Sequence, residues 1–156
     1  MAKLGLGVIG CGNMGADLAN GARDLDCARV VCVSDVDGEK GQALAEKMGS
    51  DYEADYHVML AREDVQAVLI ATPPFLHLEP AVAAAEAGVH VFCEKPMSPT
   101  LSECDKMIDA CAQGGVKLGI GLVCRFHPVH RKVRDLAHEG SLGAPTCMTV
   151  HRLGGG

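Results

Sequence analysis

The chain has 156 residues, of which 48% are apolar and 22% charged, with a net charge of −6. This size and balance fit one globular domain of ordinary size with a real core, and they exclude a disordered chain. The negative charge argues against a nucleic-acid partner, and no apolar run approaches the roughly 18 residues of a membrane-spanning helix, so we expect no membrane partner.

The chain contains eight cysteines, and their spacing includes no Cys-x-x-Cys pair. Several lie in or beside apolar runs, where free cysteine behaves as a small hydrophobic residue. The first residues lead straight into an apolar run and show no signal-peptide pattern. We therefore expect reduced thiols in a cytoplasmic protein, with neither a disulfide framework nor a metal site.

Short apolar runs alternate with longer helical patterns over most of the chain. Near-continuous apolar runs are typical of strands that are buried on both faces of a parallel sheet. The alternation predicts an α/β fold, a doubly wound parallel sheet with right-handed crossovers. The expected strands are Leu4–Ile9, Ala28–Ser34, Ala67–Ala71, Val89–Cys93 and Lys117–Leu122. The expected helices are Asn13–Leu25, Gly38–Met48, Leu76–Ala87 and Leu101–Gln113.

The pattern changes after Leu122. Phe126–His127–Pro128 interrupts the apolar run, and the following residues predict a helix over Val129–Glu139. Thr146–His151 alternates like a strand. The sequence offers this last strand no evident partner, and unpaired strands are poorly stable.

The first expected strand runs into a glycine turn that opens a helix. In a dinucleotide-binding turn, Gly10 permits the tight bend, Gly12 lets the backbone approach a pyrophosphate, and Gly15 allows close packing of helix on strand. The helix that begins near Asn13 presents free N–H groups and a positive dipole end to phosphates. A glycine turn alone is a weak signal, but its position between strand and helix predicts a dinucleotide site.

Asp35 follows the second expected strand, at about the spacing of the carboxylate that binds the adenosine ribose. This carboxylate can accept hydrogen bonds from ribose hydroxyls, whereas it would repel a 2′-phosphate. Val36 and Asp37 supply no cation, and Lys40 lies within the next expected helix. The sequence therefore favours NAD over NADP as the cofactor.

Two further motifs stand at the carboxyl ends of expected strands, where open α/β sheets bind ligands. Ala71–Thr72–Pro73–Pro74, with His77 close behind, follows one strand, and Glu94–Lys95–Pro96 follows the next. In isolation the first is an ordinary strand-to-helix turn, and His77 an exposed or helix-capping histidine. Lys95 could hold a substrate oxygen or the nicotinamide amide, while Pro96 could follow a cis peptide bond.

Together these motifs resemble the N-terminal half of the glucose–fructose oxidoreductase and inositol 2-dehydrogenase (MocA-like) family. The resemblance implies a dinucleotide-binding Rossmann domain over residues 1–123. Residues 124–156 would be a connecting helix and the first strand of an α+β substrate domain that is otherwise missing. The matching stretches are Gly10–Gly15, Ser34–Asp35, Ala71–Pro74 with His77, Ala87–Val91 running into Glu94–Lys95–Pro96, and Arg125–Phe126–His127–Pro128.

The resemblance also implies roles for individual residues. Gly10, Gly12, Asn13, Met14 and Gly15 would bind the pyrophosphate and Asp35 the adenosine ribose. Ala71, Thr72, Pro73, Pro74 and His77 would line the nicotinamide half. Glu94 would approach the nicotinamide ribose, with Pro96 beside it. Lys95 would orient substrate and nicotinamide and is the catalytic candidate, while Arg125 belongs to a family motif with a less defined cofactor contact.

Members of this family transfer hydride between a nicotinamide and a hydroxyl carbon of a sugar, cyclitol or related polyol, and the parent would be a homo-oligomer. The usual base lies in an Asp-x-x-x-His pattern, which this sequence lacks. Lys95 could replace it only with a pKa well below about 10.4. Three alternatives stay open: part of an oxidoreductase, a free-standing NAD-binding or sensing module, and part of an NAD-dependent glycosidase. In each case the chain should bind NAD(H) and by itself be a poor or inactive catalyst.

Overall fold

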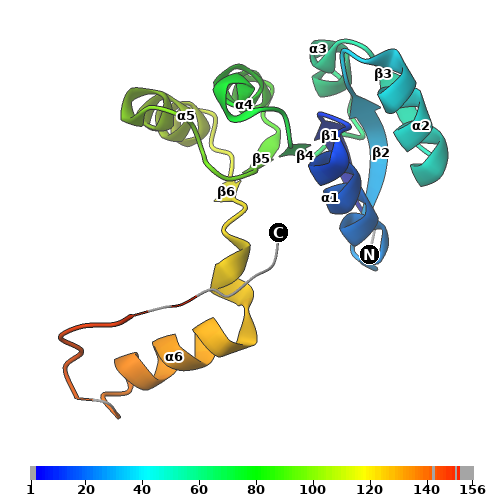
Figure 1. Ribbon diagram of the computed structural model, residues 1–156. Helices are drawn as coiled ribbons and strands as arrows, with labels where there is room; N and C mark the ends of the chain where they lie inside the picture. Colours follow the sequence, from blue (N-terminus) through cyan, green and yellow to red (C-terminus); the bar gives the residue numbers. More distant parts are fainter. Residues whose placement is uncertain (1–2, 142, 150, 152–156) are drawn as a thin grey trace. The chain divides into compact units, whose positions relative to one another are not determined.

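The computed structural model describes residues 3–141, 143–149 and 151. The chain folds into two compact units, Met1–Gly121 and Leu122–Gly156. The first unit contains a six-stranded sheet in which each neighbouring pair of strands is parallel (Figure 1). The strands are β1 (Leu4–Ile9), β2 (Ala28–Ser34), β3 (Asp51–Glu53), β4 (Ala67–Ile70), β5 (His90–Cys93) and β6 (Leu118–Ile120).

The strand order across the sheet is β3-β2-β1-β4-β5-β6. The first three strands therefore step outward in one direction from β1, and the last three step outward in the other. The register runs in phase across this reversal, since Ile9 of β1 lies beside Ser34 of β2 and Ile70 of β4. In such sheets ligands bind outside the carboxyl ends of the strands at the point of reversal. Here that point lies between β1 and β4.

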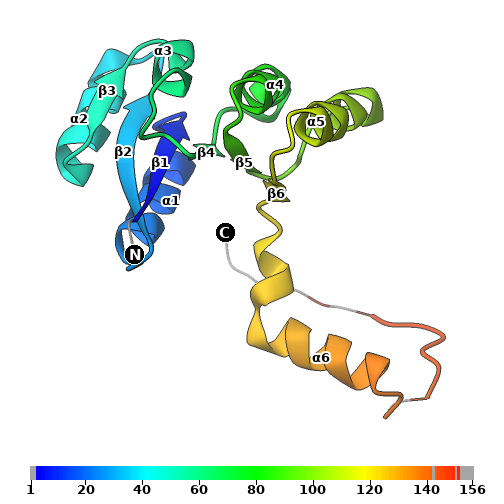
Figure 2. The same cartoon turned by 180° about the vertical axis from the view of Figure 1, so that it is seen from behind.

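Helices cover both faces of the sheet, as the two opposite views show (Figures 1 and 2). Ala19 of the first helix and Leu44 of the second pack on one face with Val8 and Val33. The helices that follow pack on the other face with Val68, Ile70 and Val91. The predicted doubly wound parallel fold is thus confirmed. The helices are α1 (Asn13–Arg23), α2 (Gly38–Met48), α3 (Tyr56–Leu60), α4 (Leu78–Glu86) and α5 (Leu101–Gln113).

The structure differs from the sequence prediction between the second and third expected strands, where it contains β3 and α3. Three residues of strand and five of helix are too short to show a hydrophobic period. A local signal was nevertheless present, because Asp55 caps α3 by accepting the His57 N–H at 2.9 Å. The expected helix 76–87 is also divided. A 3₁₀ turn, η1 (Pro74–Leu76), ends at His77, and α4 begins directly after it.

The second unit consists of a 3₁₀ turn, η2 (Val123–Phe126), and a helix, α6 (Pro128–His138). The predicted helix is confirmed to within one residue of its expected bounds. The predicted strand over Thr146–His151 is wrong for residues 146–149 and 151, which form no strand, while Val150 lies outside the described residues. A strand needs a hydrogen-bonding partner, and the described part of this unit contains no other strand to supply one.

Candidate functional site

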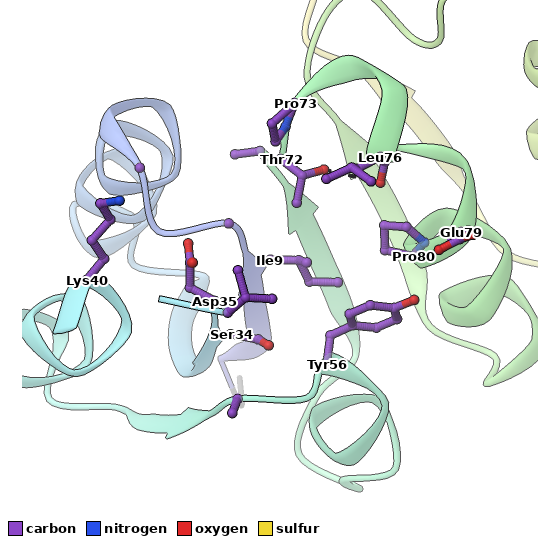
Figure 3. A pocket seen from close by; sticks show the side chains of 15 residues that line it. Ile9, Ser34, Asp35, Lys40, Tyr56, Thr72, Pro73, Leu76, Glu79 and Pro80 are labelled. Carbon is purple, nitrogen blue, oxygen red and sulfur yellow. Dashed lines mark hydrogen bonds between the residues drawn. The ribbon is translucent and has the colours of Figure 1, made fainter. Parts of the chain in front are cut away.

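A cavity of about 640 Å³ lies at the carboxyl ends of β1, β2 and β4, beside the reversal in strand order (Figure 3). Figure 3 shows Asp35 and Lys40 on one side of it and Thr72, Pro73 and Leu76 on the other. Six of the residues expected from the sequence to bind a cofactor line this cavity: Gly10, Gly12, Asp35, Ala71, Thr72 and Pro73.

The three glycines of the turn after β1 meet three different surroundings. Gly10 has a φ of +93°, and a Cβ there would come within 2.9 Å of the Ala71 carbonyl group. A Cβ on Gly15 would collide with the Gly10 carbonyl oxygen. At Gly12, by contrast, a Cβ would meet no atom within 4 Å. Gly10 and Gly15 are therefore needed by the fold itself, whereas at Gly12 only the cavity would lose space to a side chain.

The N-terminus of α1 is suited to an anion. Gly12 is its N-cap residue, no side chain caps it, and its first turn contains no acidic residue. Asn13 and Met14 of this turn are exposed, and Gly15 is buried. The helices α2 and α5 differ, since Asp37 and Thr100 accept hydrogen bonds from backbone N–H groups of their first turns. An uncapped N-terminus beside a cavity leaves N–H groups and a positive dipole end to a ligand.

Asp35 ties the glycine turn to the end of β2. Its carboxylate accepts the Cys11 N–H at 2.6 Å and the Asp37 N–H at 2.8 Å. Its own carbonyl oxygen accepts the Tyr52 hydroxyl at 3.0 Å. Each carboxylate oxygen can accept a further hydrogen bond on the side of the cavity. Asp35 thus has a structural role that the sequence reasoning did not foresee.

The ammonium group of Lys40 also belongs to this side of the cavity. It forms an ion pair with Asp37, with 2.7 Å between Lys40 Nζ and Asp37 Oδ2. The hydrogen bond with Lys40 lowers the pKa of Asp37, and the same contact raises the pKa of Lys40. The nearest cation to Asp35 in this cavity is therefore already engaged by another carboxylate.

The cavity includes side chains that the sequence reasoning missed. Tyr56 comes from the N-terminus of α3, and Glu79 comes from the first turn of α4. Burial raises the pKa of the Tyr56 hydroxyl, and the nearby charges of Glu79 and Asp55 add to this shift. The short α3 helix gave no periodic signal, although Asp55 as an N-cap could have located Tyr56.

The turn after β4 carries Thr72 and Pro73 into the cavity wall. The Thr72 hydroxyl donates a hydrogen bond to the Leu76 carbonyl oxygen at 3.3 Å, which closes the turn on itself. Pro74 begins η1, where its fixed φ and missing N–H suit the first position of a helical turn. The Thr72 carbonyl oxygen has a different partner, a side chain that directly follows η1.

That partner is His77, whose side chain is buried with 1% of the residue exposed. Its Nε2 lies 2.8 Å from the Thr72 carbonyl oxygen. Its Nδ1 lies 3.1 Å from the Pro96 carbonyl oxygen and 3.2 Å from that of Met97. Both ring nitrogens thus face backbone carbonyl oxygens, and the expected place of His77 beside the nicotinamide stays a prediction.

Glu94, Lys95 and Pro96 follow β5. Glu94 is buried and accepts the Lys95 N–H with its Oε2 at 3.0 Å, while a Cβ on Gly121 would come within 2.9 Å of its Oε1. The Lys95 side chain is exposed, and the Lys95–Pro96 peptide bond is cis, as the sequence suggested. None of the three lines the cavity at β1 and β4.

Arg125 lies in η2 of the second unit and is exposed. Its contact with a cofactor stays a prediction.

Cys11 lies inside the glycine turn but is not suited to act as a nucleophile. Burial raises the pKa of its thiol to about 12, and the charge of Asp35 adds to this shift. Burial raises the pKa of Cys93 to about 12 as well, with Glu94 as a further cause. Only a thiolate reacts readily, so both thiols are inert at neutral pH. All eight cysteines fall within the described residues and are unbridged.

Residues 4–122 match the model of the Gfo/Idh/MocA oxidoreductase family, described by its NAD-binding Rossmann fold. The chain is 40% identical over 143 residues to a 2,7-anhydro-N-acetylneuraminate hydratase of Mediterraneibacter gnavus, covering 92% of this chain and 38% of that protein. It is 32% identical over 146 residues to the myo-inositol 2-dehydrogenase of Thermotoga maritima, covering 93% and 44%.

A solved structure with the same fold carries a cofactor and a sugar nucleotide. It is the WlbA dehydrogenase of Bordetella pertussis in complex with NADH and UDP-GlcNAcA. The similarity has a TM-score of 0.86 at 29% identity and covers 91% of this chain and 44% of that one. The chain spans less than half the length of these relatives. Within the described residues, no helix is long and apolar enough to cross a membrane.

Proposed function

Because this chain belongs to the Gfo/Idh/MocA oxidoreductase family, we propose that its first unit binds NAD(H) in the cavity between β1, β2 and β4. The observation that carries the proposal is the pairing of Gly12 with the N-terminus of α1. The space beside Gly12 is open, and the helix that starts there has no side-chain cap. A pyrophosphate group supplies the negative charge and the acceptor atoms that such a helix end binds.

Asp35 is the selector for NAD in this proposal. Its carboxylate borders the cavity and would accept hydrogen bonds from the two hydroxyls of the adenosine ribose. A 2′-phosphate would lie against the same negative charge. Lys40 could relieve this repulsion, but it is paired with Asp37 at 2.7 Å. The preference for NAD over NADP therefore depends on Asp37 as well as on Asp35.

The nicotinamide side would be formed by the turns after β4 and β5. When bound, the nicotinamide supplies a hydride acceptor for a hydroxyl carbon of the substrate. Thr72 and Pro73 would limit its position from one side, and Glu94 would approach its ribose. Lys95, which is exposed, would orient the substrate oxygen or the nicotinamide amide.

The substrate class that we propose is a sugar, cyclitol or related polyol. Two relatives support this class, since one is a myo-inositol 2-dehydrogenase and the other is named for an anhydro sugar acid. The Asp-x-x-x-His pattern of the usual base does not occur in this sequence. We therefore propose that the chain by itself binds cofactor without completing the oxidation of a hydroxyl carbon.

A second candidate reaction has no net oxidation. The relative at 40% identity is named a hydratase, so its reaction as named consumes no oxidant. In that case the NAD bound by this chain would be reduced and reoxidised within one turnover. Formation of NADH with a polyol, measured on the chain joined to a substrate domain, would favour the dehydrogenase. Conversion of an anhydro sugar without accumulation of NADH would favour the second candidate.

The first test is a titration of NADH and NADPH into the chain, followed by the fluorescence of the cofactor. The chain contains no tryptophan, so the protein contributes little background. Saturable binding, tighter for NADH, is the expected result. A folded chain, checked by circular dichroism, that binds neither cofactor would contradict the proposal.

A further inference from the structure

His77 forms the connection between two turns of the candidate site. The paired strands β4 and β5 end together, and the last backbone bond between them runs from the Glu94 N–H to the Ile70 carbonyl oxygen at 2.9 Å. Beyond it, within the described chain, the contacts at hydrogen-bonding distance between residues 71–77 and 95–98 are those of His77 Nδ1 with the Pro96 and Met97 carbonyl oxygens. The other ring nitrogen, Nε2, faces the Thr72 carbonyl oxygen. A neutral ring has one N–H and donates on one side only, whereas the imidazolium form donates on both. Beyond the paired strands, His77 is thus the side chain whose hydrogen bonding connects the two turns.

The two turns that His77 joins have different tasks in the proposed function. The turn after β4 brings Thr72 and Pro73 to the cavity wall. The turn after β5 carries Lys95, which directly precedes the Pro96 carbonyl group that His77 contacts. With 1% of its surface exposed, His77 itself is closed off from a ligand in the cavity.

We propose that His77 is a positioning residue, which holds the Thr72 turn against the Lys95 turn and so sets the binding site of the nicotinamide half of the cofactor. This inference rests on the proposed function. It differs from a cofactor-contacting role for His77 because the ring acts through backbone carbonyl groups. The adenosine half is built by Gly12 and Asp35 on the other side of the cavity, so it should be independent of His77.

If His77 has this role, its replacement should cause a selective loss of affinity for ligands that contain the nicotinamide ring. ADP-ribose contains the adenosine and pyrophosphate groups of NADH but lacks the nicotinamide ring. Replacing His77 should therefore weaken NADH and spare ADP-ribose. Replacing a residue that only stabilises the fold would lower the affinity for both ligands together. If the variant still folded, it would lower neither affinity. The ratio of the two dissociation constants separates these roles.

The experiment measures NADH by cofactor fluorescence and ADP-ribose by calorimetry, with wild-type chain and three variants. His77→Ala removes both contacts. His77→Gln places an amide near the position of Nε2, and His77→Asn places one near the position of Nδ1, so each can rebuild one contact. We expect His77→Ala to weaken NADH about tenfold and ADP-ribose less than about twofold, with the two amide variants between wild type and alanine.

A matched control is His90→Ala. His90 lies at the opposite end of β5, is half-buried, and accepts the Lys117 N–H at 3.2 Å. Its replacement also removes a histidine hydrogen bond, but the ratio of affinities should not change. An unchanged ratio in a folded His77→Ala variant, or equal affinity of the wild-type chain for both ligands, would overturn the inference. If the alanine variant does not fold, amide variants that weaken NADH and ADP-ribose by the same factor would overturn it. A folded chain that binds neither ligand would overturn the proposed function itself, and the inference with it.

Discussion

The two sides of the candidate site are built by different means. On the side of β1 and β2, the groups that meet the cavity are backbone N–H groups and the Asp35 carboxylate, and Asp35 itself holds the turn. On the side of β4 and β5, a buried histidine holds two turns from behind. In the proposed function, the first side therefore uses Asp35 both for folding and for binding, whereas the second separates these tasks. Substitutions on the two sides should have distinguishable effects.

The largest effect is expected from Gly12→Val. Gly12 has extended backbone, with φ −68° and ψ −170°, which valine adopts easily, and its side chain would enter open space. The variant should fold normally and weaken both NADH and ADP-ribose more than about a hundredfold, since the side chain occupies the proposed pyrophosphate position. Fluorescence and calorimetric titrations measure these losses.

Gly21→Val is the matched control for this variant. Gly21 lies in the same helix, is exposed, and also has no atom within 4 Å of a Cβ. Binding by Gly21→Val should equal that of the wild-type chain. Tight binding by Gly12→Val would remove the glycine turn from the proposed site.

Asp35→Ala should have the next largest effect. It removes the proposed ribose acceptor and also leaves the Cys11 and Asp37 N–H groups without their carboxylate. We expect about a tenfold loss of NADH affinity, a reduced preference over NADPH, and a lower midpoint of thermal unfolding. Parallel titrations and a thermal melt measure the three quantities. If affinity for both cofactors stayed at the wild-type value, Asp35 would be a structural residue alone.

A smaller change is expected from Asp37→Asn. Asparagine still caps α2 but no longer pairs with the Lys40 ammonium group, which becomes available to a 2′-phosphate. NADPH affinity should rise by up to about fivefold, because exposed ion pairs contribute only ~0.2–1 kcal/mol. NADH affinity should change little. Adding Lys40→Gln should abolish the gain, and a gain that persisted would show that Lys40 is not its source.

A further effect, common to both sides and similar per residue to the upper range for Asp37→Asn, is a loss of stability in alkali. The folded state raises the pKa of Cys11 and Cys93 to about 12 from an ordinary value of about 9. Their contribution is complete below pH 9 and is lost as the pH rises toward 12, because only the unfolded chain ionises there. At pH 10 the loss is about 1 kcal/mol per thiol. Denaturant unfolding at pH 8 and pH 10 under reducing conditions measures it.

Cys11→Ala and Cys93→Ala identify the source of this alkaline loss. Each variant should have a smaller difference in unfolding free energy between the two pH values than the wild-type chain. A difference as large as that of the wild-type chain in both variants would assign the loss to other groups.

Several elements could be predicted because their signals are local in sequence. Leu4–Ile9, Ala28–Ser34, Gly38–Met48 and Leu101–Gln113 have the predicted bounds, since apolar runs, periodicity and caps lie within each segment. Thr100 and Glu103 are an example. The Thr100 hydroxyl oxygen accepts the Glu103 N–H, and the Glu103 carboxylate accepts the Ser98 hydroxyl. The strand predicted over 146–151 was wrong for its described residues, 146–149 and 151, because pairing, not propensity, decides whether an extended segment becomes a strand.

The sequence by itself indicated the family, five of the six strands in their order, and the glycine turn followed by an acidic residue, because each is encoded by neighbouring residues, whereas β3 and α3 were too short to predict. Only the tertiary structure decided what each residue of that pattern does. It brought Tyr56 and Lys40 to the cavity, paired Lys40 with Asp37, and gave Asp35 two backbone donors. It also buried His77 between two turns. The Lys40–Asp37 pair is local, at i,i+3. The contacts of Asp35 with Cys11 and of His77 with Pro96 instead join residues 24 and 19 positions apart, and this separation carries no signal, since they form only when parallel strands align their carboxyl ends at one edge.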